Sequence, residues 1–163
     1  AKGNVYTTAS DDNVYCFDAE TGDRLWISPM PEHIRNDPEV DTNAKEVYFV
    51  PDPFHVGGNY LVAQLQYKGQ RSLVAYTLDT GEYKWELSLD IAHFPTFIVS
   101  EEDNSVYVPA ISTGMTRVSL ETGKIIHHYP IPVQVGYSNG TEFALDNSGT
   151  LLRVSLKDEN KEE

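Results

Sequence analysis

Short runs in which apolar and polar residues alternate recur along the whole chain. Val5-Tyr6-Thr7-Thr8 and Val106-Tyr107-Val108-Pro109 are examples, and such runs are rich in Val, Ile, Tyr and Thr. A period of two with β-branched and aromatic residues is typical of half-buried β-strands. No segment sustains the 3.6-residue period of an amphipathic helix. The pattern therefore predicts an all-β protein.

A repeated motif groups the predicted strands, because an acidic residue, Thr and Gly separate two strands in each copy. The three copies are Phe17–Trp26, Tyr76–Trp85 and Val118–His127. Gly supplies the positive φ that a tight turn needs, and the Thr or acidic side chain can bond to nearby backbone amides. The structural motif residues are Thr21, Gly22, Trp26, Thr80, Gly81, Trp85, Thr122 and Gly123.

The spacing of the copies predicts the size of one repeat. Gly81 and Gly123 lie 42 residues apart, and the blades of β-propellers have periods of about 40–50 residues. Around the third copy we expect strands at residues 95–100, 105–111, 116–120 and 124–130, which form a four-stranded antiparallel meander. We therefore predict β-propeller blades over residues 1–156, about three and a half to four in number.

A fourth copy is recognised because Arg117–Leu120 recurs 36 residues later as Arg153–Leu156. We expect strands in it at 134–137, 141–145 and 151–156. Asp158 and Glu159 stand where Thr and Gly belong, and residues 157–163 are too highly charged to pack as a last strand. We predict a disordered acidic tail there. At the other end, the first expected strand, 4–10, corresponds to the second strand of a blade.

The first interval between copies is longer and contains an insertion. Gly22 and Gly81 lie 59 residues apart, and we place the insertion within residues 27–58. Five prolines and Gly57-Gly58 predict irregular loops there, around one short strand at 46–51. Long loops on a rigid scaffold often carry recognition residues. The candidate partner-binding residues in or beside this segment are Phe54, His55, Tyr60 and Tyr67. The alternative is that they cap the local core.

Phe17–Trp26 and Tyr76–Trp85 resemble the blade motif of the quinoprotein-dehydrogenase-like superfamily, which contains pyrroloquinoline quinone (PQQ) dehydrogenases and non-enzymatic relatives. The resemblance covers nearly the whole chain. It implies that the motif tryptophan docks against the neighbouring blade, which assigns Trp26 and Trp85 to packing between blades. His127 takes the equivalent place in the third copy and departs from the pattern, so that contact is expected to be weaker.

The resemblance also implies where a quinone would bind. In the enzymes it lies in the axial channel, commonly against two adjacent cysteines, with calcium held by Glu, Asn and Asp. This chain has one cysteine, Cys16, which permits no internal disulfide and which we expect to be a small buried apolar residue. That part of the quinone site is missing, which favours a non-enzymatic member of the superfamily.

Few residues of the sequence point to a metal site or a catalytic site. Acidic turns at 11–13, 101–104 and 146–149 hold oxygen ligands that suit calcium, but such residues are also common in hairpin turns. His127 and His128 are neighbours on an expected strand and point to opposite faces. His33, His55 and His93 are scattered. We predict no catalytic residue, no cofactor and no metal site, with calcium binding as the alternative.

Charge limits the classes of partner. The chain has 12 Lys and Arg residues against 25 Asp and Glu, a net charge of −13, which repels a phosphate backbone. No apolar run approaches the roughly 18–20 residues that span a bilayer. We therefore predict no nucleic-acid binding and no membrane insertion.

Asn139-Gly140-Thr141 fits a glycosylation sequon or a hairpin turn, and residues 1–4 lack the apolar core of a signal peptide, which is compatible with a removed leader.

These observations favour a non-catalytic propeller module that recognises another protein or scaffolds a larger assembly. Propellers have about 4–8 blades, so we expect a protein partner, self-association or further residues to complete the ring, unless the terminal strands share one blade. One alternative is a fragment of a PQQ-dependent or related oxidoreductase, and another is a calcium- or glycan-binding module. The resemblance leans towards an extracytoplasmic or secreted location.

Overall fold

The computed structural model describes residues 3–9, 11, 13–37, 47–89, 97–110, 114–130, 134–138, 141–145 and 151–154. In this part of the chain, strands predominate and the one helix is the single turn α1 (Glu32–Arg35). All strand pairs are antiparallel between neighbours in sequence, which gives four separate sheets. The predicted all-β meander architecture is confirmed.

The sheets contain three, four, four and three strands. The first comprises β1 (Asn4–Thr8), β2 (Asn13–Asp18) and β3 (Arg24–Pro29). The second comprises β4 (Val47–Gly57), β5 (Tyr60–Tyr67), β6 (Gln70–Thr77) and β7 (Tyr83–Leu89). The third comprises β8 (Ile98–Ser100), β9 (Ser105–Ala110), β10 (Gly114–Ser119) and β11 (Ile125–Tyr129). The fourth comprises β12 (Gln134–Ser138), β13 (Thr141–Leu145) and β14 (Leu151–Val154).

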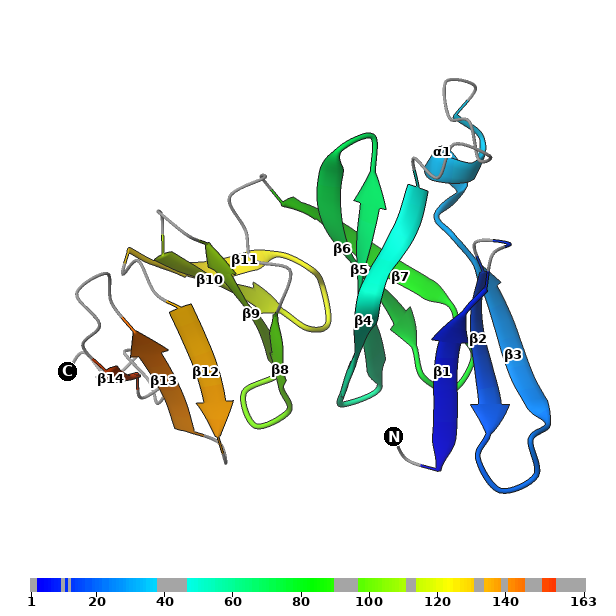
Figure 1. The fold of residues 1–163 in the computed structure, drawn as a ribbon, viewed down its shortest axis with the longest axis horizontal. Coiled ribbons are helices and arrows are strands. Elements are labelled where there is room, and N and C mark those ends of the chain that lie inside the picture. Colours follow the sequence, from blue (N-terminus) through cyan, green and yellow to red (C-terminus); the bar gives the residue numbers. More distant parts are fainter. Residues whose placement is uncertain are drawn as a thin grey trace.

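The four sheets follow one another along an arc, in sequence order, from β1–β3 at one end to β12–β14 at the other (Figure 1). Strand bounds in the third and fourth sheets agree with the sequence-based expectation to within a few residues. The acidic tail expected at 157–163 and the turn at 139–140 lie outside the described residues.

The irregular loop predicted up to residue 58 is wrong, because β4 runs through to Gly57. On β4 the register shifts between Phe49, which faces Leu65, and Phe54, which faces Ala63. Three extra residues are therefore accommodated in β4 as a bulge, in a stretch that contains Pro51 and Pro53. Because β4 is an edge strand of its sheet, the missing proline N–H groups are tolerated there.

The core lies between successive sheets. Alternate residues of the second sheet point to opposite sides, so that Leu61 packs towards the first sheet and Val62 towards the third. Both are fully buried. One core cluster contains Val14, Cys16, Trp26, Met30, Ile34, Leu61, Ala63, Leu65, Val74, Tyr76 and Leu78, and the other contains Val62, Leu73, Ala75, Trp85, Leu89, Phe97, Val106, Val108, Val118 and Leu120. Burial on both faces explains the nearly continuous apolar runs of β5 and β6. Cys16 is buried, as expected.

Candidate interaction surfaces

The three motif turns share one backbone geometry. The glycines Gly22, Gly81 and Gly123 have φ values of 77°, 70° and 67°, which L-residues with a Cβ rarely adopt. Each glycine N–H donates to the carbonyl four residues earlier: Gly22 to Asp18 at 2.9 Å, Gly81 to Thr77 at 3.0 Å and Gly123 to Ser119 at 2.9 Å. The turn is therefore a repeated unit that positions its side chains in the same way in each sheet.

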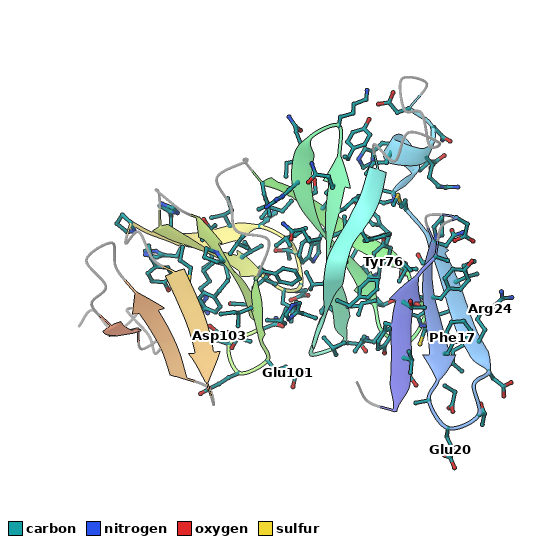
Figure 2. All side chains as sticks on the ribbon, in the orientation of Figure 1. Phe17, Glu20, Arg24, Tyr76, Glu101 and Asp103 are labelled. Atoms are coloured by element: carbon teal, nitrogen blue, oxygen red, sulfur yellow. The ribbon has the colours of Figure 1, made fainter. Side chains whose placement is uncertain are left out.

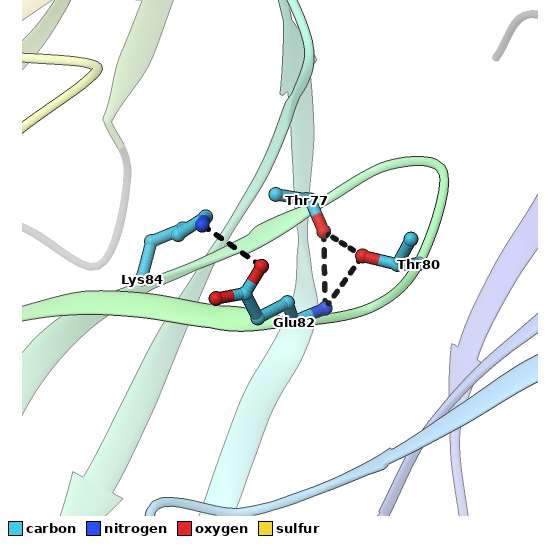
Figure 3. Close-up of polar contacts among 4 residues, drawn as sticks. All are labelled: Thr77, Thr80, Glu82 and Lys84. Atoms are coloured by element: carbon cyan, nitrogen blue, oxygen red, sulfur yellow. Dashed lines mark hydrogen bonds and ion pairs between the residues drawn. The ribbon is translucent and has the colours of Figure 1, made fainter.

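Side chains within the motif turns add further hydrogen bonds to the turn backbone. Thr21 Oγ1 accepts from the backbone N–H of Asp23 at 3.2 Å. In the second turn, the hydroxyl oxygens of Thr77 and Thr80 lie 2.6 Å apart, and both accept from the N–H of Glu82, at 3.0 and 3.4 Å (Figure 3). Lys84 Nζ lies 2.9 Å from Glu82 Oε2 (Figure 3). The Thr of the motif thus has a local structural role.

The motif tryptophans lie between neighbouring sheets. Trp26 Nε1 donates to the carbonyl oxygen of Leu78 at 2.9 Å, and a Cβ at Gly81 would come 2.5 Å from Trp26 Cε3. Trp85 makes the same contacts with the third sheet, through Leu120 and Gly123. Each tryptophan therefore covers the motif glycine of the next sheet. The third copy is different, because His127 is exposed and lies against the Tyr129 ring at 4.5 Å.

The four aromatic residues singled out from the insertion do not form one patch. Phe54 lies 5.9 Å from Phe49 and packs with Tyr67 against the core between the first and second sheets. His55 lies 4.4 Å from the ring of Phe97 and, like Tyr60, packs on the other side of the second sheet. All four are partly buried. Their role as partner-binding residues stays a prediction, and the structure distributes them over two different interfaces.

Sequence reasoning missed a polar cluster on the third sheet, formed by Asp103, Ser105, Tyr107 and Arg117. Arg117 lies 3.1 Å from Asp103 Oδ2, and its Nε donates to Ser105 Oγ at 2.8 Å. The Tyr107 hydroxyl donates to Asp103, and burial, followed by this hydrogen bond, raises the pKa of Tyr107. The aligned motif copies could have indicated this cluster. Arg117 occupies the position of Ala75 in the second copy, and Ala75 is buried.

Exposed carboxylates gather at one side of the molecule. In a four-stranded antiparallel meander the first and third turns lie at the same edge of the sheet. The Gly58 N–H donates to Glu101 Oε1 at 3.1 Å, which links these edges in the second and third sheets. In the three-stranded first sheet, the turn between β2 and β3 corresponds to the third turn. We call this the acidic turn side. Among the described residues it carries seven exposed carboxylates, Glu20, Asp23, Asp79, Glu82, Glu101, Glu102 and Glu121, and three cations, Arg24, Lys84 and Lys124. Glu20 and Glu101 are labelled at this edge in Figure 2.

In the described part of the chain, no group of three or more His, Cys, Asp or Glu side chains is arranged to hold a metal ion. No described helix is long and apolar enough to cross a bilayer. His128 Nδ1 lies 3.2 Å from Thr116 Oγ1, while His127 pairs with Arg117 across the sheet. The second histidine thus has a partner within the sheet.

Comparison with solved structures supports the propeller architecture. BamB from Moraxella catarrhalis matches with a TM-score of 0.57 and 10% identity, over 93% of this chain and 42% of that one. The quinohemoprotein alcohol dehydrogenase ADHIIG from Pseudomonas putida HK5 matches with a TM-score of 0.55 and 16% identity, over 93% and 32%. The computationally designed protein Ika4 matches with a TM-score of 0.57 and 15% identity, over 94% and 86%.

These similarities show the fold, and they show the relative size of this chain. It spans less than half of the length of the two natural proteins. No curated protein sequence matches it significantly. A family profile does match, over residues 1–159, and its description is outer membrane protein assembly factor BamB. The resemblance to PQQ-repeat propellers is thereby confirmed, and the chain belongs to this BamB family of β-propellers.

Proposed function

We propose that this chain is a non-catalytic propeller module that recognises a partner protein through its acidic turn side and holds it within a larger assembly. The observation that carries the proposal is the set of exposed carboxylates that three successive sheets present at one edge. Backbone hydrogen bonds close the short motif turns that carry most of these carboxylates, so that the surface can meet a basic partner without ordering a flexible loop.

The family description supports a role in assembly, and it also supports an extracytoplasmic location, which fractionation of the source cells would test.

The charge of the surface has a kinetic consequence as well. A patch of one sign attracts an oppositely charged partner over about one Debye length, about 10 Å at 0.1 M salt. The partner is therefore expected to bind faster at low ionic strength.

Glu82 pairs with Lys84 and Glu101 accepts from Gly58, so the test uses four of the other exposed carboxylates: Glu20, Asp79, Glu102 and Glu121. The variant E20Q/D79N/E102Q/E121Q keeps the shapes of the side chains and removes four charges. The immobilised wild-type chain and this variant would be incubated with an extract of the source cells, and the bound proteins would be quantified by mass spectrometry. A partner is then retested as a purified protein by surface plasmon resonance.

We expect at least about tenfold weaker binding of that partner to the fourfold variant, because each surface charge contributes a few tenths of a kcal/mol up to about 1 kcal/mol. The control is Glu32→Gln, which removes an exposed charge in α1, at the opposite side of the molecule (Figure 1). If the wild type and the fourfold variant bind equally well at low and high salt, the acidic turn side is not the recognition surface.

A further inference from the structure

The three strands that follow the motif turns differ in how they protect their free edge, the side that has no neighbouring strand. β3, β7 and β11 each lie at the end of their sheet. The backbone groups on a free edge can pair with another chain, and charged residues or proline discourage such pairing. β3 carries Arg24 and Pro29, and β7 carries Lys84 and Glu86. β11 contains no Lys, Arg, Asp, Glu or Pro.

β11 is the one strand of these three that has no buried residue. Its residues are Ile125, Ile126, His127, His128 and Tyr129. Ile125 and Ile126 are exposed to 59% and 51%. In β3 and β7 the motif tryptophan is buried against the next sheet, whereas His127 at the same position is exposed. Large apolar side chains in water, on a strand with a free edge, mark β11 as an interaction site.

The bulge in β11 is not what distinguishes it, because all three strands have a bulge at the same motif position. The extra residue is Leu25 in β3, Lys84 in β7 and Ile126 in β11. Each lies directly before the tryptophan position. Lys84 and Ile126 therefore occupy equivalent backbone positions, and only Lys84 brings a charge to its strand.

The opposite edges of the sheets are less open. β1, β4 and β8 stand at the other end of the first three sheets, and β4 contacts both β1 and β8. These three strands therefore lie next to one another. The strands at the outer end, β3, β7 and β11, are better placed to meet a second molecule, and of these β11 alone lacks edge protection.

The charge of the chain limits what can pair with β11. A strand that carries charges would lose their hydration at this edge without finding an opposite charge in β11. The matching strand is therefore uncharged as well. Two copies of this chain, each with a net charge of −13, repel one another least where carboxylates are absent. The β11 strand of a second copy meets both conditions.

We propose that β11 is a self-association site, at which the third sheets of two copies join edge to edge. The two strands run antiparallel about a two-fold axis, so that His127 faces its own counterpart, Ile126 faces His128 and Ile125 faces Tyr129. This register uses the whole strand, and its pairs of Ile with Tyr are of the aromatic and β-branched kind that stabilises a sheet. The interface is isologous and closes at two copies. Pairing of β11 with β1, which is also uncharged, would instead be head-to-tail and open-ended.

Sedimentation equilibrium of the full chain tests the association. A strand of 5 residues buries less area than a standard interface, so we expect a dissociation constant between about 1 µM and about 1 mM. Salt should strengthen the dimer, because it screens the repulsion between two acidic chains. Binding of a basic partner to the acidic turn side weakens with salt, so the two effects are separable. A chain that stays monomeric up to about 1 mM at high salt, or that grows beyond a dimer, overturns the proposal.

The repeat provides a matched pair of variants. Ile126→Lys gives β11 the residue that β7 has at the equivalent bulge, so the variant should fold, which circular dichroism checks. We expect it to raise the dissociation constant of the dimer at least about tenfold, because each copy then brings a charge to the shared edge. Leu25→Lys makes the same change in β3 and should leave the dissociation constant unchanged. An unchanged dimer in Ile126→Lys, or equal weakening by both variants, would rule out β11 as the interface.

A cysteine at the two-fold axis tests the register independently. In His127→Cys the two introduced thiols face one another, within the distance that a disulfide spans. In Ile125→Cys they lie about four residues, or about 13 Å, apart along the paired strands. The native Cys16 is buried and is present in both variants. Under mild oxidation, His127→Cys should form the covalent dimer at least about tenfold faster than Ile125→Cys, and equal rates would overturn this pairing.

Discussion

The indole nitrogen of Trp85 donates a hydrogen bond of 2.9 Å to the carbonyl oxygen of Leu120, 35 residues further along the chain. The same ring covers Gly123, where a Cβ would come 2.6 Å from Trp85 Cδ2. Gly81 stands in the same relation to Trp26. The glycine of the motif thus has two functions: it closes a tight turn, and it makes room for the indole of the preceding sheet.

Alanine substitutions should separate these two functions. Gly22→Ala and Gly69→Ala place a Cβ in open space at positive φ, and we expect each to cost about 1–2 kcal/mol of unfolding free energy from backbone strain alone. Gly81→Ala and Gly123→Ala add a clash with an indole, which should cost about 1–3 kcal/mol more. Urea denaturation of the four variants measures the difference. Equal losses in all four would mean that the tryptophan rings adjust freely.

Phenylalanine at the tryptophan positions should show the value of the indole hydrogen bond. Trp26→Phe and Trp85→Phe remove the donor to a buried carbonyl oxygen, and an unsatisfied buried acceptor costs about 1–3 kcal/mol. His127→Phe is the matched control, because His127 has the same motif position and is exposed. Its effect should stay within about 0.5 kcal/mol. A large loss in the control would show that His127 also docks on a neighbour.

Two buried tyrosines should respond in opposite directions to loss of the hydroxyl group. Tyr76 is fully buried, and its hydroxyl has no hydrogen-bond partner among the described residues. The Tyr107 hydroxyl donates to Asp103. We expect Tyr76→Phe to raise the unfolding free energy by about 1 kcal/mol and Tyr107→Phe to lower it by about 1–3 kcal/mol. Thermal and urea unfolding measure both, and a destabilised Tyr76→Phe protein would point to a partner for that hydroxyl.

The turns and most strands could be predicted from the sequence because local residues determine them. The positive φ of Gly22, Gly81 and Gly123 follows from residue type and spacing, and so does the bond from Asp23 N–H to Thr21 Oγ1. Strand β9 could be predicted from its β-branched and aromatic residues Val106, Tyr107 and Val108, although the structure buries all three rather than alternate ones. These features depend on contacts within a few residues.

Features that depend on the partner sheet could not be predicted in the same way. The sequence of β4 contains Pro51 and Pro53, which suggested loops, but pairing with β5 on both sides of the bulge maintains the strand. Phe54 and His55 are adjacent in sequence and pack against different sheets, so no single patch forms. Leu25 and Ile27 are exposed although both are apolar, because burial depends on how whole sheets pack together, which the local sequence does not specify.

Asp18 should make stability depend on pH at the first motif turn. Its Oδ1 accepts from the backbone N–H groups of Thr21 and Glu20, both at 2.8 Å, and these bonds hold the pKa of Asp18 below its ordinary value. Since the unfolded chain binds the proton more readily, the stabilisation is complete above a pH of about 4 and is lost as the pH falls through the lower folded pKa. The second motif has Thr77 at this place, which does not titrate.

Asp18→Asn keeps an acceptor oxygen and removes the titration. We therefore expect the difference in unfolding free energy between the wild type and Asp18→Asn to change as the pH is lowered from 5 to 2, in the direction that disfavours the wild type. Thr77→Asn changes the equivalent position without a titrating group, so its difference from the wild type should not vary with pH. Urea denaturation at each pH gives both differences. A constant difference for Asp18→Asn over this range would mean that the two backbone bonds do not persist in solution.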